Sequence, residues 1–168
     1  CINYGDLINE GCGGFVGASS NIYIKNCKNY GSFGNNQYIG GICGEETKGI
    51  IENCTNYSDV TEYNSGIISN VNNNIIIKNC INYGNLIGGD GIVSSVYLEP
   101  EVLIQNCINE GEFKSKFSSG IIGGIGGGYV RIFNCINKTN MNDYNSGILG
   151  TSYGSFAIPQ VSIRNCVN

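Results

Sequence analysis

The sequence contains no histidine among its 168 residues. Without His, neither a Ser–His nor a Cys–His pair can activate a nucleophile, and the commonest metal ligand is missing. The nine cysteines form no Cys-x-x-Cys pair, which excludes the usual zinc and thioredoxin-type motifs. We therefore expect no catalytic residue, no metal and no cofactor, and we do not expect an enzyme.

Charge is also scarce, because Lys, Arg, Asp and Glu make up 13% of the chain and the net charge is -4. No basic patch is present that could bind nucleic acid. No apolar run reaches the length of a membrane span, about 18 residues. Glycoside hydrolysis needs two carboxylates on either side of the scissile bond, whereas the carboxylates here are scattered: Asp6, Glu45, Glu46, Asp59, Asp90, Glu99, Glu101 and Asp143.

Good helix formers such as Ala, Leu and Lys are few, which argues against a helical repeat. Gly and Asn are abundant instead, at 26 residues each, and β-branched residues are frequent. The apolar residues are regularly placed, so the composition is not that of a disordered chain. These features favour short β-strands separated by turns.

Two landmarks alternate along the chain and reveal an internal repeat. Seven cysteines are separated by 26, 27, 26, 27, 28 and 31 residues, at positions Cys1, Cys27, Cys54, Cys80, Cys107, Cys135 and Cys166. Between them stand GFVG (14–17), GICG (41–44), GIIS (66–69), GIVS (91–94), GIIG (120–123) and GILG (147–150). A copy in every repeat indicates architecture rather than an active site.

Each repeat predicts three short strands. Alternating apolar residues precede each cysteine, and the column three residues before it is Ile24, Ile51, Ile77, Ile104, Ile132 and Ile163. A second apolar column follows six residues after each cysteine, at Leu7, Phe33, Val60, Leu86, Phe113 and Met141. The third strand is the GIIG stretch. We predict one all-β domain over residues 1–168, a parallel β-helix or β-solenoid of about six coils of 26–31 residues, with coils starting near 1, 27, 54, 80, 107 and 135 and a partial last strand at 163–168.

An asparagine precedes each internal cysteine, at Asn26, Asn53, Asn79, Asn106, Asn134 and Asn165. Asn tolerates the left-handed conformation of a sharp corner, and stacked amides can bond to one another. The cysteine after it should point inward as a small apolar residue, reduced and buried, because parallel stacked side chains suit disulfide geometry poorly. A second asparagine, two residues after each cysteine, should begin the next turn.

Tyrosines form a further column at Tyr4, Tyr30, Tyr57 and Tyr83, continued by Glu110 and Lys138. The favoured interpretation is a self-stacking surface ladder, and the alternative is a strip that binds sugars. Strict alternation also places a further apolar column on the outside of the solenoid, where it would give lateral contacts with another molecule. Its members are Val16, Cys43, Ile68, Val93, Ile122 and Leu149.

The motifs resemble the GLUG-type repeats of bacterial cell-surface proteins. GGFVG, SGIIG and SGILG match the Gly-Leu-hydrophobic-Gly step, and IKNCKNYG and IKNCINYG match the Ile-x-Asn-Cys-x-Asn-x-Gly step. The resemblance covers essentially the whole chain, although Ile or Phe often replaces Leu and Ser twice replaces the last Gly. It implies a secreted or surface-anchored protein, often a stalk or an adhesin.

We therefore expect a structural β-solenoid at the cell surface or outside the cell, which self-associates by head-to-tail stacking, lateral packing or both. The chain starts and stops at the same phase of its repeat, which suggests a filament unit or a piece of a longer solenoid. The alternatives are a glycan-binding adhesin that uses the tyrosine column and, less favoured, a polysaccharide-active enzyme. An ice-binding face would need periodic threonines, and the five threonines show no period.

Overall fold

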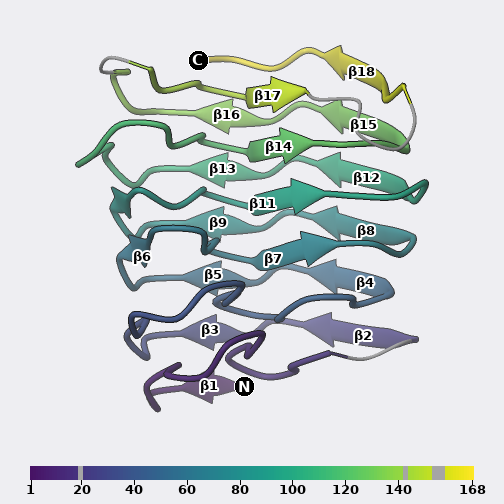
Figure 1. The fold of residues 1–168 in the computed structure, drawn as a ribbon. Helices are drawn as coiled ribbons and strands as arrows, with labels where there is room; N and C mark the ends of the chain where they lie inside the picture. The colour runs from purple at the N-terminus through teal and green to yellow at the C-terminus, as the bar shows by residue number, and fades with distance from the viewer. Residues whose placement is uncertain (19–20, 142–143, 153–157) are drawn as a thin grey trace.

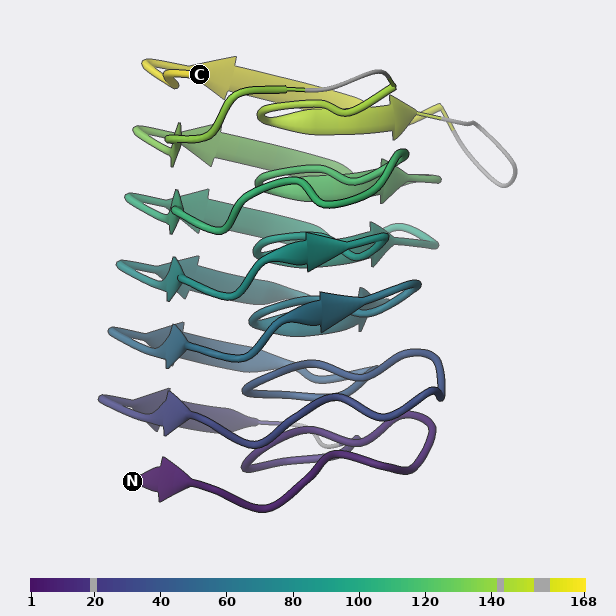
Figure 2. The ribbon, with the colours of Figure 1, turned by 90° about the vertical axis from the view of Figure 1, so that its left-hand side faces the viewer.

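The computed structural model describes residues 1–18, 21–141, 144–152 and 158–168. Its strands pair only with strands of neighbouring coils, and nearly all pairings are parallel. Successive coils lie on top of one another along one axis, from the first coil at one end to the last at the other (Figure 1 and Figure 2). The predicted all-β, parallel β-solenoid of about six coils is confirmed.

The first sheet consists of the strands that lead to each asparagine–cysteine corner. Residues three before the cysteines stay in register throughout, so Ile24 pairs with Ile51 and Ile51 with Ile77. Inward and outward residues alternate regularly before each cysteine, and this stretch forms the longest strands of the fold. They are β2 (Ile22–Lys25), β4 (Gly49–Glu52), β8 (Ile75–Lys78), β12 (Glu101–Gln105), β15 (Tyr129–Phe133) and β18 (Gln160–Arg164).

The second sheet lies directly after the corner, closer to the cysteine than the sequence predicted. Its strands contain two residues each and end at the second asparagine of the repeat. They are β1 (Ile2–Asn3), β3 (Lys28–Asn29), β5 (Thr55–Asn56), β9 (Ile81–Asn82), β13 (Ile108–Asn109) and β16 (Ile136–Asn137). The column six residues after the cysteine forms strands in only two coils, β6 (Val60–Thr61) and β10 (Leu86–Ile87).

The third sheet begins at the second apolar residue of each GIIG-type stretch and continues past it. Its four strands are β7 (Ile68–Val71), β11 (Val93–Val96), β14 (Ile122–Ile125) and β17 (Leu149–Ser152). In the first two coils the same position makes only isolated bridges, from Val16 to Cys43 and from Cys43 to Ile68.

The main core combines inward residues of the first and third sheets with the corner cysteines, and the second core cluster covers the column six residues after the cysteine. Ile51, Ile77, Ile104 and Ile132 are fully buried, as the predicted column requires. Ile163 and Met141 differ from that prediction, because they are 44% and 47% exposed. Both belong to the last part of the solenoid, where fewer coils cover them.

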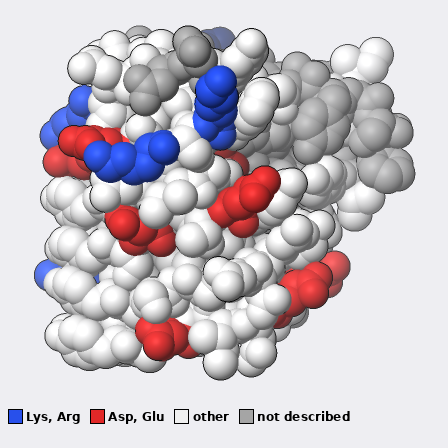
Figure 3. All heavy atoms as spheres, turned by 60° about the vertical axis from the view of Figure 1, so that its left-hand side comes forward, with Lys and Arg blue, Asp and Glu red and all other residues white. Residues whose placement is uncertain are grey.

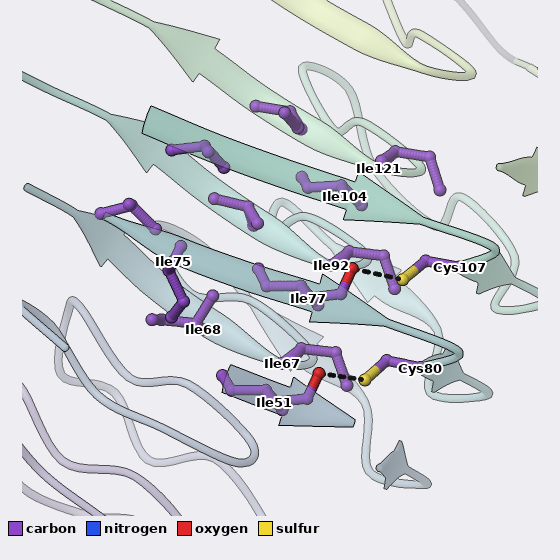
Figure 4. Packing of buried hydrophobic residues seen from close by; sticks show 14 of the residues in the cluster. Ile51, Ile67, Ile68, Ile75, Ile77, Cys80, Ile92, Ile104, Cys107 and Ile121 are labelled. Atoms are coloured by element: carbon purple, nitrogen blue, oxygen red, sulfur yellow. Dashed lines mark hydrogen bonds between the residues drawn. The ribbon is translucent and has the colours of Figure 1, made fainter. Parts of the chain in front are cut away.

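The predicted outward apolar column is wrong. Cys43, Ile68, Val93 and Ile122 are completely buried, and so are the residues just before them, such as Ile67. Two neighbouring residues can both point inward because the strand begins only at the second one, so the chain bends between them. In Figure 4, Ile67 and Ile68 point in different directions into the same cluster. These residues therefore form no exposed apolar stripe, and the lateral contacts that we expected from such a stripe cannot form through them.

Candidate functional site

The corner asparagines adopt the conformation that the sequence predicted. Asn26, Asn53, Asn79, Asn106, Asn134 and Asn165 all have φ between 52° and 56°. Their side chains are exposed, and the amide of the upper coil donates to the one below at 3.3 Å for Asn53 to Asn26 and 3.1 Å for Asn106 to Asn79. The left-handed backbone turns the chain, and the exposed amide ladder lines the outside of that turn.

The cysteines line the inside of the same corner. The thiol of Cys80 lies 3.4 Å from the Lys78 carbonyl oxygen and 3.8 Å from the Ile51 carbonyl oxygen of the coil below (Figure 4). A short side chain with a weak donor suits this concave position beside backbone carbonyls. All nine cysteines are free thiols. The prediction of burial fails at Cys1, which is exposed, and at Cys166, which is half-buried, because each lies in a terminal coil.

Thiol reactivity should follow this burial. Cys54, Cys80 and Cys107 are completely buried, so a reagent cannot reach these thiols in the folded protein. We expect iodoacetamide to label Cys1 in the native protein, and to label Cys54, Cys80 and Cys107 only after denaturation without reductant. Peptide mass spectrometry measures both. Native labelling of Cys80 as fast as Cys1, or a Cys54–Cys80 disulfide, would contradict this expectation.

The second asparagine of the repeat forms an internal ladder of side-chain amides. The sequence pattern predicted only that this asparagine would begin a turn. Asn56 Nδ2 donates to Asn82 Oδ1 at 2.8 Å, and Asn82 Nδ2 donates to Asn109 Oδ1 at 2.8 Å. The same amides donate to the carbonyl two residues later, so Asn82 also reaches Gly84. The ladder continues through every coil, over Asn3, Asn29, Asn56, Asn82, Asn109, Asn137 and Asn168.

The tyrosine column is a face-to-face stack. Ring centroids are 5.3 Å apart for Tyr4 and Tyr30, 4.5 Å for Tyr30 and Tyr57, and 5.2 Å for Tyr57 and Tyr83. Above the stack, Lys138 and Glu110 form an ion pair at 2.7 Å. Because each inner ring covers its neighbours, the column presents mainly ring edges to solvent, which leaves few ring faces on which a sugar could stack.

Charged residues gather on the outer face of the first sheet. Glu52 accepts a hydrogen bond from the Tyr23 hydroxyl at 2.7 Å, and this bond lowers its carboxyl pKa. Lys25 and Lys78 flank it at 3.5 and 3.4 Å on adjacent strands. Further along the face, Glu101 and Arg131 are shared by two shallow grooves of about 400 and 240 Å³.

Asp90 is the one scattered carboxylate that the fold buries almost completely among the described residues, at 8% exposure. It stands directly before the glycine of the GIVS stretch, where neighbouring coils have Ser65 and Ser119. Its Oδ1 accepts the Ser119 backbone N–H at 2.8 Å. Burial raises the pKa of this carboxyl well above its usual value, although Ser119 and Ser94 partly offset the effect.

A raised pKa means that the folded state binds the Asp90 proton more tightly than the unfolded state. Stability from this group therefore increases as the pH falls through the raised pKa and is lost at higher pH. We expect Asp90→Asn to raise the free energy of unfolding at pH 7 by about 1 to 3 kcal/mol, because the amide keeps an acceptor for Ser119. The gain should disappear near pH 3, where the acid is protonated in both states.

Urea unfolding at the two pH values measures this difference, and the exposed Asp59→Asn serves as the matched control. Asp59 accepts a backbone hydrogen bond from Asn85 at the surface, so its substitution should change little at either pH. A destabilised Asp90→Asn at pH 7 would show that the ionised carboxylate is stabilising in the fold.

A groove of about 640 Å³ opens beside Asp90. It lies between the third and fifth coils, over the connection that leads to the third sheet, and its wall includes Glu62, Tyr63, Lys116 and Phe117. In Figure 3 charged side chains of both signs are sparse on the visible face, and most of that surface is neither acidic nor basic. Nothing in the repeat pattern of the sequence predicted this groove.

Within the described ranges, no three His, Cys, Asp or Glu side chains are arranged to hold a metal ion. No helix in that part of the chain is long and apolar enough to cross a membrane. Comparison of the chain with protein-family models, with curated proteins and with solved structures finds no match. The likeness to GLUG-type repeats therefore remains a resemblance of motifs.

Proposed function

We propose that this chain is a structural β-solenoid without catalytic activity, which forms a fibre, filament or stalk at the cell surface or outside the cell. The observation that carries the proposal is the internal asparagine ladder, which repeats the same hydrogen bonds in every coil. Such uniform contacts suit a stiff rod, since each coil contacts only its neighbours and the same contacts recur along the axis.

The partner that we propose is a further coil of the same kind. Because the ladders keep one register from coil to coil, any two coils have matching hydrogen-bonding edges and could stack head to tail. Such a heterologous contact generates an open fibre rather than a closed ring.

Sedimentation velocity over a range of concentrations, with electron microscopy of the same samples, tests the assembly. We expect rods that lengthen with concentration while their width stays constant. A protein that stays monomeric and forms no rods at any concentration would contradict the fibre, and release of reducing ends from any polysaccharide would contradict the absence of catalysis.

The tyrosine column supports the structural proposal over the adhesin. Its inner rings lie within 4.5 to 5.3 Å of one another, so stacking with a sugar would compete with stacking in the column. A glycan array with Tyr30→Ala and Tyr57→Ala separates the two hypotheses. Binding that is lost in both variants would favour an adhesin that uses this column.

A further inference from the structure

A second aromatic column runs along the solenoid, and it is interrupted. The residue three positions before the invariant glycine of each GIIG-type stretch has a left-handed backbone in all six coils, with φ between 61° and 90°. Four of these residues are aromatic and two are glycine. From the first coil to the last they are Gly11, Tyr38, Tyr63, Gly88, Phe117 and Tyr144.

The interruption at Gly88 comes from both the missing side chain and a shorter connection. The register pairs Val60, Leu86 and Phe113, and the next shared positions are Ser65, Asp90 and Ser119. Between these positions lie four residues in the third coil (61–64), three in the fourth (87–89) and five in the fifth (114–118). The fourth coil therefore takes the shortest path, and its surface is recessed between two longer neighbours.

The recess leaves two aromatic rings without a stacking partner on the side that faces Gly88. Tyr63 is 52% exposed on one side of Gly88, and Phe117 is 75% exposed on the other. Phe117 stacks on Tyr144 at 5.3 Å with its other face. Two coil spacings separate Tyr63 from Phe117, about 9 to 10 Å, so one further ring between them would lie about as far from each as the stacked tyrosines lie from one another.

Polar groups surround this position. Asp90, Glu62 and Lys116 line the groove with several hydroxyl groups. The hydroxyl-bearing residues of the lining include Ser94, Ser95 and Thr151. Lys116 Nζ lies 5.5 Å from the Tyr144 ring centroid, which holds its charge at the rim of the groove.

We propose that the groove at Gly88 is a binding subsite for a glycan, in which one pyranose ring lies between Tyr63 and Phe117. The ring's C–H faces would contact the aromatic side chains, while its hydroxyls donate to Asp90 or Glu62 and accept from Lys116. An aromatic side chain of a protein partner would use the rings but would leave most of these polar groups unpaired, so the lining favours a sugar.

Titration calorimetry of the full chain tests the proposal with defined probes: chitohexaose, cellohexaose, xylohexaose and, for the competing occupant, N-acetyltyrosinamide. We expect at least one oligosaccharide to bind. Tyr63→Ala and Phe117→Ala should each weaken it about tenfold or more, since each removes one face of the stack. Tyr4→Ala, in the other column, should leave the affinity unchanged, and circular dichroism confirms that each variant is folded.

Three results would overturn the subsite. The first is that no oligosaccharide binds at concentrations up to about 10 mM, because a dissociation constant above that value would be too weak for a useful single site. The second is that an oligosaccharide binds but that neither Tyr63→Ala nor Phe117→Ala changes its affinity. The third is that N-acetyltyrosinamide binds and the sugars do not, which would assign the groove to a protein partner. None of these results bears on the fibre, so the subsite and the proposed structural role fail separately.

Discussion

Asn82→Ala is expected to lower the free energy of unfolding by about 3 kcal/mol or more. Asn82 is completely buried in the middle of the internal ladder. Its removal leaves the Asn56 amide donor, the Asn109 carbonyl oxygen and the Gly84 carbonyl oxygen without this partner. Each buried polar group that loses its hydrogen bond costs about 1 to 3 kcal/mol, and alanine supplies no replacement.

Asn79→Ala is the matched control, since it changes the same residue type three positions earlier, on the other side of Cys80. The Asn79 side chain is exposed and accepts one hydrogen bond from Asn106 at 3.1 Å at the surface, and its backbone is left-handed, with φ of 55°. Alanine in that conformation costs about 1 kcal/mol. Urea unfolding followed by circular dichroism measures both variants. Equal losses of stability would mean that the buried amides contribute no more than the corner.

Gly91→Ala should have a still larger effect and is expected to prevent folding of the central coils. A Cβ atom at Gly91 would lie 2.0 Å from the Gly120 carbonyl oxygen and 2.9 Å from Asn109 Oδ1. Both atoms belong to the next coil, so relief would require coils to separate. Overpacking of a rigid core costs about 1 to 3 kcal/mol, and here the clash also displaces the internal ladder.

Gly17→Ala provides the comparison, because the nearest atom to its Cβ would be the Gly11 carbonyl oxygen at 3.7 Å, an ordinary contact. Its stability should stay within about 0.5 kcal/mol of the parent protein. Thermal unfolding and the yield of folded protein report on both variants. A soluble Gly91→Ala protein with an unchanged unfolding midpoint would show that adjacent coils can move apart at little cost.

These two predictions explain why the repeat has two landmarks. The invariant glycine of the GIIG-type stretch and the second asparagine of the cysteine motif lie far apart in each repeat, yet they touch in space. At Gly66 an added Cβ would lie 2.5 Å from Asn82 Oδ1, and at Gly120 it would lie 2.4 Å from Asn137 Oδ1. Only glycine lets the backbone approach the amide ladder this closely.

The period of the cysteines and the alternation before them were sufficient to predict the solenoid, because stacked coils repeat one pattern of inward and outward residues. The left-handed corner at residues such as Asn26 was also predictable, since few residues tolerate that conformation. Both features depend on local sequence, and the structure confirms both.

The internal ladder was missed for a physical reason. Alternation judged by hydrophobicity treats a polar residue such as Asn56 as a surface or turn residue, because a buried amide without partners is costly. Its partners here are the same residue in the next coils, which a single repeat does not show. The usable signal was the presence of asparagine two residues after all seven cysteines, from Asn3 to Asn168.

The groove at Gly88 depends on a difference between coils, which an emphasis on the repeat conceals. The spacing from Cys80 to Cys107 is 27 residues, as it is from Cys27 to Cys54, so overall coil length does not reveal the short connection. The burial of Ile68 was missed because alternation assumes a straight strand, whereas the chain bends just before it. Both errors concern the connections between strands, where length and direction vary most.

The internal ladder also gives the solenoid an electric polarity. From Asn3 to Asn137 every ladder amide donates toward the next coil, so their dipoles add along the axis, whereas backbone dipoles within sheets largely cancel. The corner amides point the opposite way, but they are exposed to water, which screens them. As with a helix, the end toward which the N–H groups point favours anions and the opposite end favours cations. Two such rods would therefore attract each other end to end in one sense and repel in the reverse, which gives any fibre built from them a single direction.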